Sequence, residues 1–420
     1  MSELNVGNLN ITSELNLPIY PESGLPGGVP VGHMVFNSTK GKIVVWNGTV
    51  WVAIGSKKYN ITTGGNVTAT DLSGDWAGYR VLKYTGNGSL VVNSAPDDQG
   101  IEMLLVAGGG GGGGVIGGGG GAGGVIYKRS LYLPQGTYSI TIGQGGPGGN
   151  GWNANDQEGR AGTPTSFIGG DVYYEAIGGG GGCGHGGASP NASAGFGGSG
   201  GGGANLNRQG GGCTGSLGGN INNHLTGDYD MTYNNPGRFA NVDAWARLKP
   251  PFRDFAVGNA TSGDPQHLSS RTNTPPGPHI IKGLQGYPGG DWGDGNLGAG
   301  GGGAGGFGQA AGPPRGVAGD GGVGAYFEIE GIKKAYAGGG GGGTRGTGRI
   351  RGIGGVGGGG NGGRNTASPT PYASPTADAA SNGQDNTGGG GGGGGYNGPS
   401  GSAIGGAGGP GVLIIRYKVN

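Results

Sequence analysis

Two cysteines are the residues of this sequence that could bind a metal ion or form a disulfide. Cys183 and Cys213 are 30 residues apart, and each has glycine on at least one side. A zinc site could use both cysteines with His185 and a further histidine, but zinc ligands usually have closer spacing. A disulfide between them would contribute about 3–4 kcal/mol by the loop-closure model. The glycine neighbours favour a third interpretation, two small thiols packed between glycine segments. We predict no metal and no cofactor, and leave the pairing of the cysteines open.

Motifs for phosphate binding and nucleophilic catalysis give no support for an enzyme. Gly-x-Gly-x-x-Gly recurs because glycine is frequent, and no copy precedes a helical pattern with a later acidic ribose partner. No Gly-Lys-Ser/Thr sequence occurs, and no Gly-x-Ser-x-Gly lies between a strand and a helix. The carboxylates form only loose local pairs, whereas glycoside hydrolysis needs two carboxylates across a groove. We therefore predict that the protein is not an enzyme.

Aromatic side chains gather in a glycine-poor insertion, residues 221–287, which holds 7 glycines in 67 residues. Aromatic residues are common anchors of protein contacts, and their faces also stack on sugar rings. For Phe252 and Phe255, a small buried cluster or a subunit seal is at least equally favoured. A second interruption covers residues 365–387. We predict host or subunit contact by five aromatic residues in or near these insertions: Tyr229, Tyr233, Trp245, Trp292 and Tyr372.

Glycine dominates the scaffold that must position these residues. The chain has 120 glycines among 420 residues, and its 25 basic and 24 acidic residues give a net charge of +1. Glycine is unfavourable inside helices and adds no side chain to a core, which excludes an ordinary α/β enzyme. A net charge near zero gives no indication of nucleic-acid binding. Unbroken runs such as Gly108–Gly114, without a strict three-residue repeat, exclude collagen.

The glycine runs need a regular conformation in which the backbone N–H and C=O groups form hydrogen bonds with neighbouring segments. A polyproline-II-type helix has three residues per turn and no internal hydrogen bonds, so its backbone groups must bond to neighbours. Glycine allows such helices to approach one another closely. We therefore predict a lattice of packed polyglycine II helices that is stabilised by backbone hydrogen bonds rather than by an apolar core.

Short segments rich in Val, Ile and Tyr lead into the glycine runs, and we predict that they are strands. They cover residues 101–107, 125–133, 137–142, 173–177, 325–330, 334–337 and 412–419. The predicted fold class is mainly β with almost no α-helix. A β-sandwich, from which the polyglycine helices extend, would occupy residues 100–420, behind a β-rich connector at residues 58–99.

Residues 1–57 have a different character and contain a hairpin signal. Asn47-Gly48 between two apolar runs predicts a two-residue type I′ turn, in which Trp46 pairs with Thr49 and Val44 with Trp51. Both faces would then be apolar or aromatic, which is more than one hairpin can bury. We predict that this module attaches and oligomerises the protein through Val44, Trp46 and Trp51.

The termini and the composition bear on location. The first residues lack the basic and apolar regions of a signal peptide, and no run of 18 apolar residues occurs. We therefore expect synthesis in a cytoplasm without membrane insertion. A charge-poor composition rich in Asn, Thr and Gly nevertheless suits a surface outside cells. Assembly into a virus particle in a host cytoplasm, followed by release, reconciles the two.

Two parts of the chain resemble proteins of tailed bacteriophages. The segment from Gly32 to Val52, with its Lys-Ile-Val-Val-Trp-Asn-Gly-Thr-Val-Trp core, resembles a module of phage tail, neck and fibre proteins, those of marine cyanophages among them. Residues 101–420 resemble the glycine-rich domain of phage fibre and adhesin proteins. That domain opens with a Val-Ala-Gly strand exit, here residues 104–114. It closes with Gly-Pro-Gly-Val-Leu-Ile-Ile-Arg-Tyr, here residues 409–417.

The resemblance implies a structural virion protein, attached by its N-terminal part and presenting the glycine-rich part outward. The expected partners are copies of itself, as a homotrimer or higher oligomer, and other virion proteins through the N-terminal module. A host surface glycan or outer-membrane protein is the expected external partner. Two alternatives stay open, a decoration or filament protein of the virion and a non-viral extracellular matrix or adhesion protein.

Overall fold

The computed structural model divides into two compact units. The first comprises Met1–Lys58 with Pro96–Asp98, and the second comprises Tyr59–Ala95 with Gln99–Asn420. The structure describes residues 17–54, 58–96, 99–150, 157–170, 172–184, 197–204, 285–290, 296–312, 316–346, 348–364, 379–396 and 403–419.

The first unit contains a four-stranded sheet in the order β1-β2-β3-β4. Its strands are β1 (Ile19–Tyr20), β2 (Met34–Asn37), β3 (Lys42–Trp46) and β4 (Trp51–Ala53), with a short 3-10 turn at Glu22–Gly24. β1 runs parallel to β2, whereas the other pairs are antiparallel. Val35 and Val44 are opposite each other on β2 and β3, and both are buried.

The hairpin of β3 and β4 has a different register from the predicted one. Trp46 pairs with Trp51, and Val44 pairs with Ala53. The predicted pairs of Trp46 with Thr49 and of Val44 with Trp51 are therefore wrong. Four residues connect the strands instead of two.

The side chain of Asn47 explains the longer connection. Its Oδ1 accepts hydrogen bonds from the backbone N–H groups of Thr49, at 2.9 Å, and Val50, at 2.8 Å. Asparagine often forms such local bonds in turns, and they compete with the ladder bonds of a tighter hairpin. Gly48 supplies the left-handed conformation that the loop requires, with φ of 99°.

The second unit is built on an eight-stranded sheet in the order β11-β10-β9-β6-β14-β7-β8, with β5 paired to β6. A 3-10 turn at Gly74–Trp76 precedes β6. The strands are β5 (Asn60–Asp71), β6 (Tyr79–Ser94), β7 (Ile101–Val106), β8 (Val125–Leu131), β9 (Gly136–Thr141), β10 (Thr165–Gly169), β11 (Val172–Ala176) and β14 (Val412–Lys418). The predicted strands at residues 101–107, 125–133, 137–142, 173–177 and 412–419 are confirmed.

Residues 58–99 are part of this sheet, not a connector to it. β6 is 16 residues long and pairs with β14 through its first half and with β9 through its second half. β5 pairs along the same strand, with an irregularity between Gly65 and Val67. Glycines in both strands interrupt the alternation of side chains, so the sequence pattern understates the strands.

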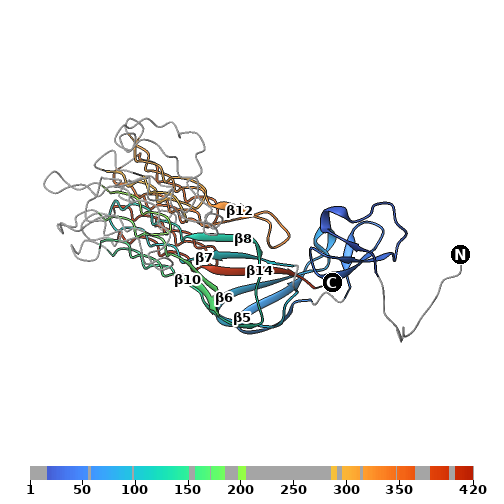
Figure 1. The fold of residues 1–420 in the computed structure, drawn as a ribbon. Coiled ribbons are helices and arrows are strands. Elements are labelled where there is room, and N and C mark those ends of the chain that lie inside the picture. Colours follow the sequence, from blue (N-terminus) through green and yellow to red (C-terminus); the bar gives the residue numbers. More distant parts are fainter. Residues whose placement is uncertain are drawn as a thin grey trace, which may run out of the picture. The chain divides into compact units, whose positions relative to one another are not determined.

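The sheet curves until it nearly closes around one apolar core. β14 lies between β6 and β7, and its Leu413, Ile415 and Tyr417 are buried in that core with the aromatic rings of Tyr138 and Phe167 (Figure 1). The mainly β class is as predicted. The sandwich takes the form of a single curved sheet, because the end strands β8 and β11 come close to each other.

A separate two-stranded sheet packs on the opposite side of β14. It consists of β12 (Ala325–Phe327) and β13 (Lys334–Tyr336), which confirms the predicted strands at residues 325–330 and 334–337. Phe327 and Tyr336 are buried there with Ile414 of β14. The residues that the structure describes contain no α-helix.

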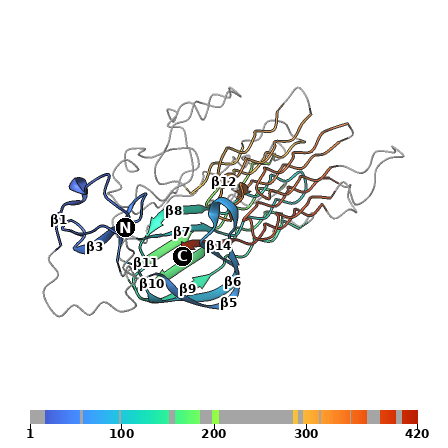
Figure 2. The ribbon, with the colours of Figure 1, turned by 90° about the vertical axis from the view of Figure 1, so that its right-hand side faces the viewer.

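The glycine segments run side by side away from the sheet (Figure 2). Their backbone hydrogen bonds repeat every third residue. Gly109 and Gly112 donate to Gly409 and Gly406, and Gly110 and Gly113 donate to Gly121 and Gly118. Gly111 and Gly114 donate to a third neighbour, at Arg160 and Gln157. Each segment is thus bonded to several neighbours in turn, with the three-residue period expected of a polyproline-II-type helix.

The space between these segments explains why glycine is required. A Cβ at Gly110 would lie 2.1 Å from the carbonyl oxygen of Gly180, and one at Gly391 would lie 2.0 Å from that of Gly406. No side chain fits at such a distance. The glycine content is therefore a packing requirement of the backbone lattice.

Candidate surface site at the distal end of the glycine segments

The glycine segments end, away from the sheet, in a group of turns that we call the distal end. Its described parts include the turn at Val115, the segment end at Tyr396 and Thr344, which forms an isolated bridge with Leu297. Tyr396 donates its backbone N–H to the carbonyl of Thr344, at 3.0 Å, and Val115 donates to that of Ala403, also at 3.0 Å. At the distal end, residues with side chains follow the glycine runs.

The turn at Val115 and Ile116 reverses the chain between two glycine runs. Both residues have positive φ, 42° and 55°, which is rare for β-branched side chains. Both are fully buried with Ala403, and the ring of Tyr396 packs against them. Burial of these side chains offsets the strained backbone, so this turn has a small apolar core of its own.

Arginines mark the neighbouring part of the distal end. Residues 344–364 hold four arginines and no acidic residue. Gly346 and Gly348, with φ of 102° and 75°, allow the chain to reverse there. The Arg345 guanidinium lies 4.4 Å from the centroid of the Tyr396 ring, which is a favourable cation–π geometry. The other three arginines are Arg349, Arg351 and Arg364.

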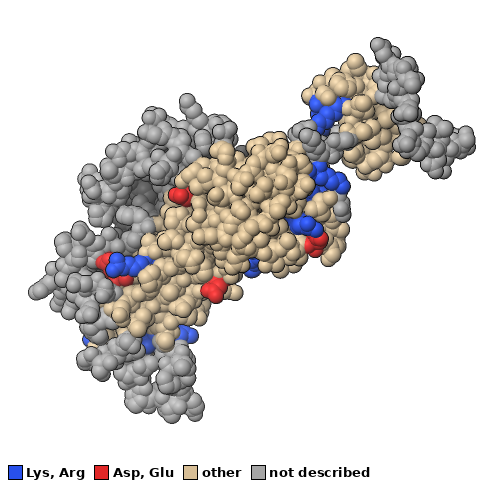
Figure 3. Space-filling model, turned by 90° about the horizontal axis from the view of Figure 1, so that it is seen from below, with Lys and Arg blue, Asp and Glu red and all other residues tan. Residues whose placement is uncertain are grey.

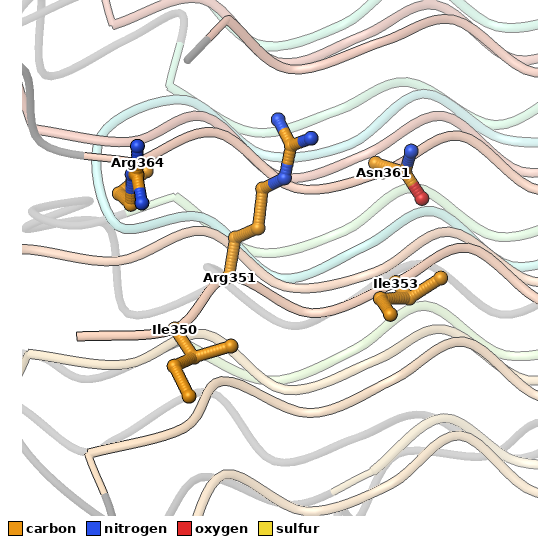
Figure 4. Close-up of a pocket in the computed structure, with 5 residues that line it drawn as sticks. All are labelled: Ile350, Arg351, Ile353, Asn361 and Arg364. Carbon is orange, nitrogen blue, oxygen red and sulfur yellow. The ribbon is translucent and has the colours of Figure 1, made fainter. Parts of the chain in front are cut away.

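A shallow groove of about 300 Å³ lies between two adjacent segments of this region (Figure 4). Ile350, Arg351 and Ile353 come from one segment, and Asn361 and Arg364 come from the next. In Figure 4 the Arg351 side chain lies between Arg364 and Asn361. The two isoleucines are 57 % and 61 % exposed, so the groove combines cationic and apolar surface.

Backbone bonds hold the two walls of this groove in register. Gly362 donates its N–H to the carbonyl oxygen of Gly352, at 2.9 Å. Gly354 donates to Oδ1 of Asn361, also at 2.9 Å, which fixes the orientation of that amide. The wall positions are therefore set by the lattice, and only the side-chain ends can adjust.

Two of the five residues that line the groove are arginines. An arginine offers five N–H donors and no acceptor, and it matches carboxylate or phosphate oxygens in pairs. Asp320 lies beside the residues that line the groove, and its Oδ1 accepts a hydrogen bond from the N–H of Ile353, at 2.7 Å.

Metal and membrane chemistry find no support in the described ranges. These ranges contain no group of three His, Cys, Asp or Glu residues that could hold a metal ion. No helix in them is long and apolar enough to cross a bilayer. On the face viewed in Figure 3, charged side chains are sparse over most of the described surface.

The predicted aromatic contact residues cannot be placed in this geometry. Tyr229, Tyr233, Trp245, Trp292 and Tyr372 all lie outside the described residues, as do His185 and Cys213. Cys183 is fully buried. Its backbone donates to Gly202, at 3.1 Å, and accepts from Gly118, at 2.8 Å. Glycine segments therefore flank this cysteine on two sides.

The predicted oligomerisation residues lie in the first unit with different degrees of exposure. Val44 is only 2 % exposed within one chain, whereas Trp46 and Trp51 are half-buried. The two indole rings pack on each other with centroids 5.7 Å apart, and Trp51 Nε1 donates to the carbonyl of Pro26. Self-association through these residues stays a prediction.

Sequence reasoning missed the arginine groove because the groove lies inside a glycine tract. Its residues come from short interruptions of the glycine tract that look like ordinary loop residues. The long glycine-poor insertions were the clearer signal for a contact surface. The detectable signal was the presence of four arginines and no carboxylate between Thr344 and Arg364. This local excess of basic residues is not visible in the net charge of the whole chain, which is near zero.

Comparison with known proteins gives a family for most of the chain. No curated protein matches it. A family model described as a glycine-rich domain matches residues 85–418, from within β6 to the end of β14. The match includes most of the curved sheet, the glycine segments and the arginine groove. The chain therefore belongs to the family of this glycine-rich domain.

Proposed function

We propose that the protein is a structural component of a tailed-phage particle, a fibre or adhesin on the virion surface that contacts the host. The resemblance of residues 32–52 to phage tail and fibre modules supports the viral context. The architecture of the second unit supports the display role. Its glycine segments are joined by backbone hydrogen bonds and carry few side chains along their length. Other residue types follow them at the distal end.

The distal end is the observation on which this proposal depends. A lattice of glycine segments leaves almost nothing for recognition along its length, since glycine has no side chain. Arg345, Arg349 and Ile350 instead lie near the reversal of the chain at Gly346 and Gly348. Aromatic and Arg side chains in such places are typical anchors of binding surfaces. The protein would act by binding, without a catalytic step of its own.

The two units would divide this work. The first unit would attach the chain to other virion proteins and to its own copies, in a homotrimer or higher oligomer. The second would present the distal end to a glycan or protein of the host surface. The localisation that follows is the virion surface, after synthesis in the host cytoplasm.

Labelling of virus particles tests this proposal. Antibodies against the second unit, with gold detection in electron microscopy, should label fibres or the tail of particles that encode the chain. A chain without residues 1–57 should be made and folded but missing from particles. The control is Gly312→Ala, whose new methyl would have nothing within 4 Å, and this chain should be incorporated normally. Labelling of the capsid alone would favour a decoration protein. Absence from every particle would overturn a virion role.

A further inference from the structure

We propose that a row of exposed aliphatic side chains on one glycine segment binds the same row of a second copy of this chain. The row consists of Ile350, Ile353 and Val356, which are 57 %, 61 % and 55 % exposed. We call it the apolar row, and Figure 4 shows its two isoleucines on their segment. It lies in the second unit, so it is a different surface from the one predicted for self-association of the first unit. It does not depend on the virion role.

Backbone hydrogen bonds hold the three side chains of the apolar row in line. The carbonyl oxygens of all three residues accept hydrogen bonds from one adjacent segment. The donors are Ala318, Gly321 and Gly324, at 2.9, 2.8 and 2.6 Å. Donors and acceptors both recur at every third residue, so the segment keeps the period of a polyproline-II-type helix along the whole row.

The glycines of the same segment show why its side chains lie at the surface. A Cβ at Gly352 would lie 2.1 Å from the carbonyl oxygen of Gly319, and one at Gly355 would lie 1.9 Å from that of Gly322. Side chains therefore fit only on the face that points away from these neighbours. Single exposed aliphatic residues are common on protein surfaces. Three in line on one face are instead typical of a contact surface.

The spacing of the row indicates which partner fits it. Residues three apart on a polyproline-II-type helix are separated by about 9 Å. Alternate residues of a β-strand are about 6.4–6.8 Å apart, and successive turns of an α-helix are about 5.4 Å apart, so neither stays in step with the row. A second polyproline-II-type row does, and every copy of this chain carries one of the same length and chemistry. We therefore assign a second copy as the partner.

A twofold axis would bring two such rows together in opposite directions. Ile350 of one copy would then lie near Val356 of the other, in an interface that uses the same surface on both copies. Val323, which is 49 % exposed on the adjacent segment, adds apolar surface. Stable interfaces bury about 800 Å² on each partner, and four aliphatic side chains supply only part of that area. The contact should therefore be weak and dependent on concentration.

Sedimentation equilibrium of the full chain over a hundredfold range of concentration tests this contact. The mass of the parent should rise with concentration to at least twice that of the Ile353→Glu variant. This difference is expected whether single chains pair or whether oligomers held by the first unit pair, because the substitution leaves the first unit unchanged.

Charge variants distinguish contact between two identical rows from contact with any other surface. Ile353→Glu and Ile353→Lys each place like charges on facing rows, so each should lower the association constant at least tenfold. An equal mixture of the two places opposite charges on facing rows and should recover association to near that of the parent. All variants should unfold at the same temperature as the parent, because the changed side chains are exposed.

Ile404→Glu is the matched control. Ile404 is also an exposed isoleucine, at 48 %. The next residue, Gly405, donates its N–H to Gly149, which belongs to a different part of the lattice from the apolar row. This variant should associate within twofold of the parent.

Three results would overturn the inference. The first is a parent with the same mass as both Ile353 variants at every concentration. The second is a loss of association in both variants without recovery in their mixture, which would show that the row contacts a different surface. The third is an equal loss in the Ile404 control, which would show a general effect of charge. None of these results bears on the labelling of virus particles, so the display function is tested separately.

Discussion

Replacement of Gly110 by alanine tests the packing of the lattice at one interior point. The new methyl would lie 2.1 Å from the carbonyl oxygen of Gly180 and 2.9 Å from that of Gly179. Comfortable contacts between such atoms are about 3.5 Å. The neighbouring segment must therefore move by more than about 1 Å.

That movement affects named hydrogen bonds. Gly179 donates to the carbonyl of Gly108, and Gly121 donates to that of Gly180, both at 2.8 Å. Weakening two buried backbone bonds costs about 1–3 kcal/mol, and steric strain from an extra methyl is of similar size. The lower entropy of the unfolded alanine chain offsets about 0.4–1 kcal/mol. We expect a net loss of about 3 kcal/mol in the free energy of unfolding.

Urea unfolding followed by circular dichroism measures this loss against a matched control. A Cβ at Gly312 has nothing within 4 Å, and its φ is not in the left-handed region, so Gly312→Ala should be neutral or slightly stabilising. Gly391→Ala, whose methyl would lie 2.0 Å from the Gly406 oxygen, should behave like the Gly110 variant. Unfolding free energies within about 0.5 kcal/mol for all three variants would refute the backbone-contact reasoning.

Three further predictions follow from polar contacts. Burial raises the pKa of Glu330, but hydrogen bonds from Lys83 and Tyr336 outweigh it and lower this pKa below the ordinary 4.5. The folded pKa is thus depressed, so stability from this carboxylate is present above pH 4.5 and lost as the pH falls further. Glu330→Gln should flatten this acid dependence in urea unfolding from pH 3 to 7, and an unchanged slope would contradict it. Asn47→Ala should destabilise the first unit by about 1 kcal/mol in thermal unfolding, whereas Asn47→Asp keeps the acceptor and should cost less. Arg416→Met should cost about 3–5 kcal/mol because it removes the cation that neutralises the largely buried Glu102, which then keeps the hydrogen bond from the Tyr127 hydroxyl; adding Glu102→Met should recover part of this, and strictly additive losses would argue against the pair.

The strands were predictable where side chains alone determine them. Ile101–Val106 and Val412–Lys418 are runs of apolar residues, and both are central strands of the sheet. β5 and β6 were harder, because Gly64 and Gly65 in one and Gly86 and Gly88 in the other break the pattern. Closure of the sheet depends on which distant strands become neighbours, as in the pairing of β14 with β6, and a local pattern holds no such information.

The candidate site was predictable only in part, and for a related reason. The expectation that recognition groups interrupt the glycine runs applies to the arginine groove. Its location, however, depends on the register of adjacent glycine segments, which brings Arg351 beside Arg364. Glycine runs carry no side-chain pattern from which to derive a register. The hairpin between β3 and β4 is a second, local example. Asn-Gly predicts a two-residue turn, but the side-chain hydrogen bonds of Asn47 stabilise a four-residue loop instead.

Hydrogen exchange measured by mass spectrometry tests most directly whether the glycine segments form a hydrogen-bonded lattice. Peptides that cover Gly108–Gly114 and Gly338–Gly343 contain buried amides bonded to neighbouring segments. Their amides should exchange as slowly as those of the central strand β14 and should lose protection together in urea. Exchange of these glycine amides at the rate of an unstructured peptide, while β14 stays protected, would contradict the lattice.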